Sequence, residues 1–189
     1  IEYLDAVNNA ENPDLGSRKI AFSRYLYIER DDFTLEKPNK NYKRLALGLE
    51  VRLMHAYFIK CNDVILDENG NIKEIHCTYD EQTKSGSGFN ARKPNGTIHY
   101  VEATTARKAT FNLFEPLIID DENDDRPFIE RVNPNSWIKK YGFVEGSIPS
   151  TNVLDSYQFI RNGYYTVDKE STEDNLVFNR TVALKSSYR

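Results

Sequence analysis

The sequence has little cysteine, no long apolar run and no excess of positive charge. Its two cysteines, Cys61 and Cys77, lie in strand-like runs that could be neighbours in a hairpin. Two thiols make no disulfide framework, so we expect a reduced, cytoplasmic protein. No run approaches the length of a membrane span and no charged-then-apolar leader is present, so we expect neither export nor membrane anchoring. The chain opens on Ile1 instead of methionine, which suggests a piece of a longer protein.

The sequence also lacks a catalytic or metal-binding set. His55, His76 and His99 each lie in a β-patterned run, and none stands beside a partner at metal-ligand spacing. Gly86-Ser87-Gly88 lacks the lysine-serine continuation and the following helix of a phosphate-binding loop. The acidic run between residues 115 and 130 lacks the glycine and terminal glutamate of a calcium loop. We therefore predict no catalytic centre, no cofactor and no metal in this chain.

Alternating apolar and polar residues predict strands through most of the chain. The longest strand signal runs from Glu50 to Leu66, and Asn69-Gly70 supplies the positive φ angles of a hairpin turn before the partner strand at 72–79. Short strands separated by Gly, Pro and Asn indicate an all-β barrel or sandwich. The polar residues 1–15 are a linker, for which a disordered tail and an ordered arm are both open. Further strand-like runs are 97–102, 110–119, 137–143, 156–167 and 176–184.

Positive charge is concentrated just before and within the longest predicted strand. The net charge of the whole chain is −4, so any contact with nucleic acid requires a localised patch. Tyr42 and Tyr57 are interleaved with the basic residues, a composition typical of a groove that follows phosphates and stacks bases. A solvated charged face is the alternative. The charged residues of this stretch are Lys37, Lys40, Lys43, Arg44, Arg52 and Lys60, with Glu50 as the acid.

Segments along the chain resemble, in order, the anticodon-binding region of the glutaminyl-tRNA synthetase family. The most specific segment holds Tyr42-Lys43-Arg44-Leu45, Glu50-Val51-Arg52-Leu53 and Ala56-Tyr57-Phe58-Ile59-Lys60. The resemblance runs from about Gly16 to the C-terminus, which makes it more specific than any single motif. The other matching segments are Gly16-Ser17-Arg18, Tyr27-Ile28-Glu29-Arg30-Asp31-Asp32-Phe33, Ile75-His76-Cys77-Thr78-Tyr79-Asp80, Gly96-Thr97-Ile98-His99-Tyr100-Val101, Tyr157-Gln158-Phe159 and Val177-Phe178-Asn179-Arg180-Thr181-Val182-Ala183-Leu184-Lys185.

This resemblance implies a fold and a domain plan. The family's region consists of two antiparallel β-barrels of the ribosomal protein L25-like type, with short helical turns. Residues 1–16 would lead in from an upstream catalytic part, and residues 17–189 would form the two barrels. The internal boundary would lie near residue 118, with possible exchange of a strand.

The resemblance also implies a function and partners. The parent would be a class I aminoacyl-tRNA synthetase of translation that attaches glutamine to tRNA(Gln) with ATP and Mg. The class I signatures that hold ATP are absent, so this chain would be a non-catalytic, monomeric reader of the anticodon loop, joined to the catalytic domain. The alternatives are a related glutamyl-tRNA synthetase and a free-standing L25-like ribosomal RNA binder. Gln158 with Arg44 favours the glutamine family.

Site residues follow from the family's motif positions. An amide donates and accepts at once, as a uracil edge requires, and a guanidinium forks onto the two acceptors of guanine. The implied contacts are Arg52 with the first anticodon base, Gln158 and Arg161 with the middle uracil, Arg44 and Lys43 with a third-base guanine, and Lys40 within the basic patch.

Two features of this sequence bear on those contacts. Gln158 and Arg161 have opposite strand parities, so both can face RNA only if the strand ends or bulges between them. Met54 stands where the family often has arginine, which weakens the expected contact near the first base. Arg92 and Lys93, in a predicted basic loop, would add sequence-independent attraction.

Overall fold

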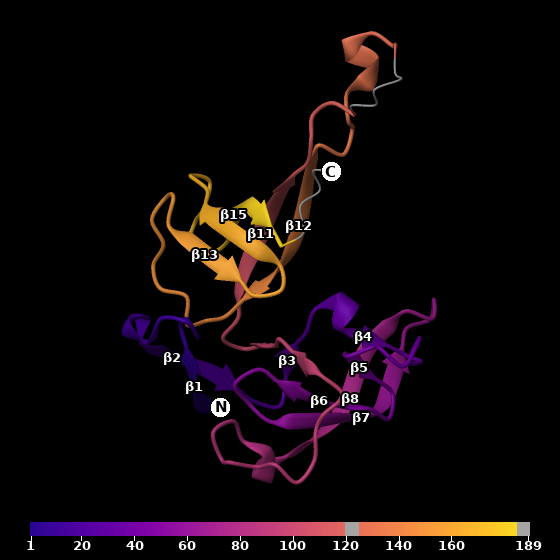
Figure 1. Ribbon diagram of the computed structural model, residues 1–189, viewed down its shortest axis with the longest axis vertical. Coiled ribbons are helices and arrows are strands. Elements are labelled where there is room, and N and C mark those ends of the chain that lie inside the picture. Colours follow the sequence, from indigo (N-terminus) through magenta and orange to yellow (C-terminus); the bar gives the residue numbers. More distant parts are fainter. Residues whose placement is uncertain (120–124, 185–189) are drawn as a thin grey trace. The chain divides into compact units, whose positions relative to one another are not determined.

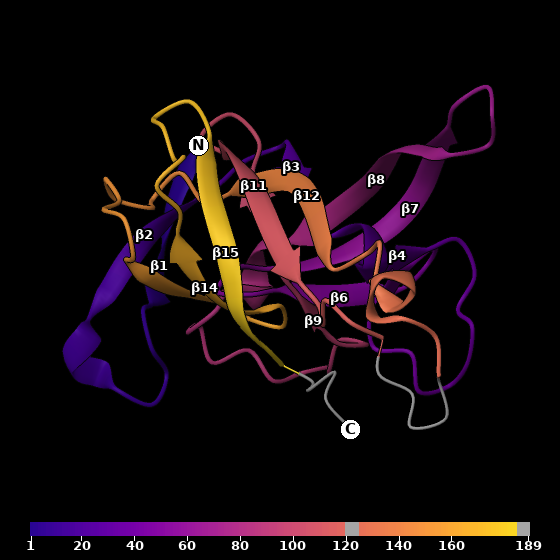
Figure 2. The ribbon, with the colours of Figure 1, turned by 90° about the horizontal axis from the view of Figure 1, so that it is seen from above.

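The computed structural model describes residues 1–119 and 125–184, and strands dominate both ranges. The largest sheet has the order β12-β11-β15-β14-β13, the next β8-β7-β6-β9, and three pairs are β1-β2, β10-β3 and β4-β5 (Figures 1 and 2). The prediction of an all-β fold with short helical turns is confirmed. The elements are β1 (Glu2–Val7), η1 (Pro13–Leu15), β2 (Ser17–Phe22), β3 (Leu26–Tyr27), η2 (Arg30–Asp32), β4 (Phe33–Thr34), β5 (Leu45–Ala46), β6 (Glu50–Leu53), β7 (Phe58–Leu66), β8 (Ile72–Asp80), η3 (Glu81–Thr83), β9 (Thr97–Ile98), β10 (Val101–Glu102), β11 (Arg107–Phe114), η4 (Phe128–Arg131), β12 (Trp137–Val144), β13 (Ser156–Phe159), β14 (Gly163–Val167) and β15 (Leu176–Ala183).

Packing divides the chain into two compact units, each with its own hydrophobic core. The first unit comprises Ile1–Thr105 and Glu145–Ser147, and the second comprises Ala106–Val144 and the chain from Ile148 onward. Within the described residues, neither large sheet has a strand order that closes on itself. The predicted domain boundary near residue 118 stays a prediction; by packing, the chain passes to the second unit after Thr105.

The N-terminal residues form part of the first unit's core. Strand β1 pairs with β2, and Leu4 and Ala6 are buried among the core side chains. Of the two alternatives for residues 1–15, the ordered arm is therefore the one observed. Asp120–Asp124, the centre of the predicted acidic loop, lies outside the described residues.

The first unit breaks the longest predicted strand into a hairpin. The prediction of a single strand from Glu50 to Leu66 is wrong. Strands β6 and β7 pair antiparallel, and the Leu53 N–H donates to the Tyr57 carbonyl at 2.8 Å. His55 turns the chain with a φ of 62°. Histidine tolerates this left-handed conformation but is no turn signal, so the apolar pattern runs through the turn in the sequence.

The next turn agrees with the sequence prediction. Strands β7 and β8 meet at Asp67–Asn71, where Gly70 has a φ of 79° and the Asp67 N–H donates to the Asn71 carbonyl. The register places Cys61 directly opposite Cys77, so the cysteines are neighbours in a hairpin as expected, and both are free thiols.

The second unit is organised on the five-stranded sheet. Strands β11 and β15 run parallel side by side at its centre (Figure 2), and Phe111 and Phe178 stack on the core face. The run 156–167, predicted as one strand, is instead the hairpin β13–β14 with a turn at Ile160–Asn162. Arg161 occupies that turn with a φ of 71°.

Candidate nucleic-acid interface

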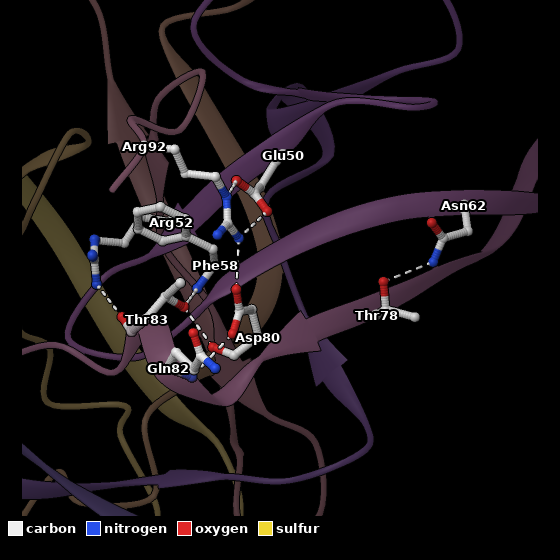
Figure 3. A network of polar contacts seen from close by, with 9 residues as sticks. All are labelled: Glu50, Arg52, Phe58, Asn62, Thr78, Asp80, Gln82, Thr83 and Arg92. Atoms are coloured by element: carbon white, nitrogen blue, oxygen red, sulfur yellow. Dashed lines mark hydrogen bonds and ion pairs between the residues drawn. The ribbon is translucent and has the colours of Figure 1, made fainter. Parts of the chain in front are cut away.

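Arg52 projects from β6, and its guanidinium is held in place. Nη1 donates to the Thr83 carbonyl and the Ser85 hydroxyl, each at 3.0 Å, and to the Ala56 carbonyl at 3.3 Å. The guanidinium carbon lies 4.3 Å from the centre of the Phe58 ring (Figure 3). Burial lowers the pKa of Arg52 from its ordinary value, yet a guanidinium remains charged at neutral pH. Arg52 is therefore a fixed cation on an aromatic ring.

Arg92 approaches the same ring but is engaged by carboxylates. Its guanidinium donates to both oxygens of Glu50, at 2.8 and 2.7 Å, and to Asp80 at 2.8 Å (Figure 3). The hydrogen bonds to Glu50 and Asp80 raise the pKa of Arg92. Two carboxylates offset its charge, and the sequence-independent attraction expected of Arg92 stays a prediction. Its guanidinium carbon lies 5.4 Å from the centre of the Phe58 ring.

Arg44, just before β5, is anchored on one side and open on another. Nη1 donates to the Asp31 carbonyl at 2.6 Å, and Nε lies 3.4 Å from the carboxylate of Asp32, whose side chain is fully buried. The Arg44 side chain is still 41% exposed, at an open hollow also lined by Phe33 and Tyr42. A guanidinium has five N–H donors in a rigid fork. Donors therefore remain for a ligand.

Asn95 and Gly96 connect the segments that carry Arg44 and Arg52. The Asn95 amide donates to the Arg44 carbonyl at 2.8 Å, and its backbone N–H donates to the Glu50 carbonyl at 2.8 Å. The Arg52 N–H in turn donates to the Gly96 carbonyl at 2.9 Å. A Cβ at Gly96 would overlap the backbone carbonyl of Lys43, which lies against it. The structure thus brings Lys43, Arg44 and Arg52 into one locally braced group.

Lys40 and Lys43 carry exposed positive charge beside that group. Lys40 lies in a turn in which the Asn39 side chain accepts from the Asn41 N–H at 2.9 Å. Both lysine side chains are exposed, and no ion pair to a described residue neutralises either one. Lys93 is exposed as well. These ammonium groups are available to a polyanion.

Gln158 and Arg161 belong to the second unit. Gln158 is exposed on β13 opposite Tyr164, and its amide makes no hydrogen bond within the described part of the chain. Strand β13 ends at Phe159, before the turn that holds Arg161. The strand end predicted as the condition for both residues to face RNA is therefore present.

The described residues contain no cluster of side chains placed to hold a metal ion. His76 contacts Glu74 at 3.0 Å on an exposed strand, and burial lowers the pKa of the half-buried His55. No three His, Cys, Asp or Glu side chains in residues 1–119 and 125–184 are placed to hold a metal ion. Across the same ranges, no helix has the length and hydropathy needed to span a bilayer.

Comparison with known proteins shows the family of the chain. Residues 1–80 and again residues 97–168 match the family described as tRNA synthetases class I (E and Q), anti-codon binding domain. The chain belongs to this family. The glutamine–tRNA ligase of Clostridium perfringens is 53% identical over 191 residues, covering 100% of this chain and 34% of the relative. That of Clostridioides difficile is also 53% identical, over 193 residues, with 100% and 35% covered.

A more distant relative is also a glutamine–tRNA ligase. The glutamine–tRNA ligase of Proteus mirabilis is 43% identical over 188 residues, covering 99% of this chain and 34% of the relative. The chain thus spans about a third of the length of the curated relatives it matches. It corresponds to the anticodon-binding part of such proteins, as the sequence resemblance implies.

In this anticodon-binding domain, the roles of the residues that anchor Arg44 and Arg52 are not predicted from the sequence. Asp32 and Asn95 anchor Arg44, and Thr83 anchors Arg52. Asp32 ends η2, Thr83 ends η3 and Asn95 lies in a loop, each in a segment separate from the arginine that it anchors. A short polar side chain in a loop carries no spacing signal. Two clues are present in the sequence: Asp32 lies within a matching segment, and Gly96, which follows Asn95, begins another.

Proposed function

We propose that this chain reads the anticodon of tRNA(Gln) for a glutamine–tRNA ligase. The observation that carries the proposal is Arg44, whose guanidinium is anchored by Asp31 and Asp32 while 41% of the side chain is open beside a hollow. A fixed guanidinium fork matches the two acceptors on the edge of guanine. Such prior anchoring reduces the entropy that binding costs.

Each remaining site residue has a proposed role. Arg52, stacked on Phe58, contacts the first anticodon base, and Gln158 contacts the middle uracil, with Arg161 in the turn beside it. Unstacked bases of single-stranded RNA expose the polar edges that such side chains bind. Lys40 and Lys43 attract phosphates without regard to sequence, and Lys43 adds to the contact with the third base.

The proposal assigns the chemistry of ligation to another part of the protein. The complete protein would attach glutamine to tRNA(Gln) using ATP with Mg, in the cytoplasm, and it would act as a monomer. Among the described residues, no three His, Cys, Asp or Glu side chains are placed to hold a metal ion. We therefore assign recognition to this chain and catalysis to the catalytic domain of the same protein.

A glutamate-specific relative is the second candidate, since the matched family covers both E and Q enzymes. The exposed amide of Gln158 and the open fork of Arg44 favour the glutamine anticodon, because uracil and guanine are the bases these groups complement. The curated relatives named above are also glutamine–tRNA ligases.

Binding to labelled anticodon stem-loops tests the proposal. Loops carrying uracil at the middle position and guanine at the third are expected to bind more tightly than loops with cytosine or adenine there. Raising the salt concentration should weaken all loops, because phosphate contacts release counterions. Equal affinity for all loops at two salt concentrations would refute anticodon reading by this chain.

A further inference from the structure

The five-stranded sheet of the second unit has a face opposite its core, here called the outer face. Residues paired across a sheet lie on the same face. Trp137 on β12 pairs with Phe114 on β11, and Asn112, two residues before Phe114, pairs with Asn179 on β15. Asn179 also pairs with Thr166 on β14. Tyr164, two residues before Thr166, lies on the same face and pairs with Gln158 on β13. Trp137 and Gln158 therefore lie on one face, at opposite edge strands.

Large aromatic rings are exposed on this face. Trp137 is 57% exposed, Tyr141 77% and Phe114 50%. The rings of Trp137 and Phe114 are stacked, with centroids 6.4 Å apart and planes 24° from parallel. Rings exposed together on one strand pair are typical of a binding surface rather than of scattered surface residues.

Two amides in a row, the buried Asn112 and the half-buried Asn179, hold the Trp137 indole. The indole Nε1–H donates to Asn112 Oδ1 at 3.1 Å, and Asn112 Nδ2 donates to Asn179 Oδ1 at 2.8 Å. The Asn179 amide donates to the carboxylate of Asp168. Asn112, which accepts from the indole, is only 5% exposed. The ring is thus positioned before any ligand arrives.

The charge of the outer face suits a polyanion. Lys139 lies 4.6 Å from the centre of the Trp137 ring, and Lys108 lies on the same face one strand away. No carboxylate is among the described strand residues whose register places them on this face. Asp168, at its border, is engaged by Asn179.

Thr110, Asn112 and Val177 in the middle of the outer face are buried, so the exposed surface is its β12 side. We propose that this side, with Trp137, Phe114 and Tyr141, is a stacking platform for unpaired nucleotides that flank the base read by Gln158. The inference rests on the proposed function, since Gln158 supplies the link to RNA. Aromatic rings beside lysines bind single-stranded nucleic acid by stacking bases and pairing phosphates. Four strand spacings, roughly 19 Å, separate the edge strands that hold Gln158 and Trp137. The two residues therefore contact different nucleotides.

Trp137 is the single tryptophan of the chain, so its fluorescence reports on this face directly. Titration with a uridine oligonucleotide, and with the anticodon stem-loop, is expected to quench the emission. Trp137→Ala should weaken binding of the labelled RNA roughly 5- to 150-fold. Tyr141→Ala, at a side chain too exposed to disturb folding, should weaken it in the same direction.

Neighbouring lysines provide a matched control. Lys139→Ala should weaken binding several-fold, whereas Lys140→Ala, which the register puts on the opposite face with Phe111, should leave it unchanged. RNA binding with unchanged Trp137 fluorescence and no effect of Tyr141→Ala would overturn the platform and point to a protein occupant. Quenching without any preference among anticodon bases would instead refute base reading by Gln158 while supporting the platform.

Discussion

Arg52 combines two restraints that lysine cannot reproduce. Its Nη1 donates to three acceptors while the guanidinium carbon lies over the Phe58 ring, 4.3 Å from its centre. A lysine ammonium keeps the charge but has no planar fork to satisfy both demands. The geometry at this residue therefore depends on the side-chain type and not only on its charge.

Arg52→Lys is expected to lower stability by about 1–2 kcal/mol, through lost hydrogen bonds and the lost stacking contact. It should also weaken binding of the stem-loop. Urea unfolding and RNA titration measure the two effects. Lys60→Ala, at an exposed position two residues after Phe58, serves as the control and should change stability little.

His55 lies in the turn between β6 and β7 and has a φ of 62°. A β-branched residue there would suffer the full steric cost of the left-handed region, so His55→Val should destabilise the protein by about 1–2 kcal/mol. His55→Asn should cost little, because asparagine tolerates this region. If both variants unfold at the same urea concentration as the wild type, backbone strain is not what selects the residue at this turn.

At the scale of elements, the turn after β10 is built around one carboxylate. Glu102 is 2% exposed and accepts from the Ser23 hydroxyl at 2.7 Å and from the N–H of Thr104 and of Thr105 at 3.1 and 2.8 Å. Burial alone would raise the pKa of Glu102, but hydrogen bonds from Ser23, Thr105 and Thr104 outweigh it and lower the pKa to about 2.

This depressed pKa makes stability depend on acid pH. The ionised form is favoured by folding, so its contribution is complete above the ordinary pKa of 4.5 and is lost as the pH falls toward 2. Glu102→Gln should cost on the order of 1–3 kcal/mol at pH 7. Urea unfolding of both proteins at pH 7, 4 and 3 should show the difference shrinking in acid. A difference that stays constant with pH would contradict the role of the charge.

Gly96 joins the Lys43 loop to β6 with no space for a side chain. Gly96→Ala would push the Lys43 carbonyl away and disturb the contacts of Asn95 with Arg44. We expect a several-fold weaker affinity for guanine-containing stem-loops, measured by RNA titration. Lys93→Ala, nearby and exposed, should reduce affinity for guanine and adenine loops alike. If the Gly96→Ala variant keeps the wild-type preference for guanine, the position of the Lys43 loop does not determine guanine recognition.

Local signals in the sequence predict some elements and miss others for physical reasons. Asn69-Gly70 predicts its hairpin because the turn requires positive φ, whereas the turn at His55 has no such signal. The parallel pairs β6–β9 and β11–β15 join segments far apart in the chain, which no local pattern reveals. Likewise Arg44 and Arg52 stand in a recognisable motif, while Asp32 and Thr83 acquire their roles only through folding.

At the scale of the whole molecule, an acidic chain would bind RNA through localised cations. With a net charge of −4, most of the surface repels a polyanion, and Lys40, Lys43, Arg44 and Arg52 cluster within one short stretch. Such a distribution favours specific contacts over coating. The salt dependence of the affinity then reflects contacts with a few phosphates, and its sequence dependence reflects contacts with a few bases.

We propose that separate residues of this chain read separate anticodon bases. The most direct test is the affinity of wild type, Arg44→Ala and Gln158→Ala for stem-loops altered at the middle or the third base. Arg44→Ala should lose roughly 1–3 kcal/mol on loops with third-base guanine and much less on loops without it. Gln158→Ala should erase the preference for middle uracil and leave the salt dependence nearly unchanged. Equal losses on every loop for both variants would contradict base reading and reduce these residues to general RNA contacts.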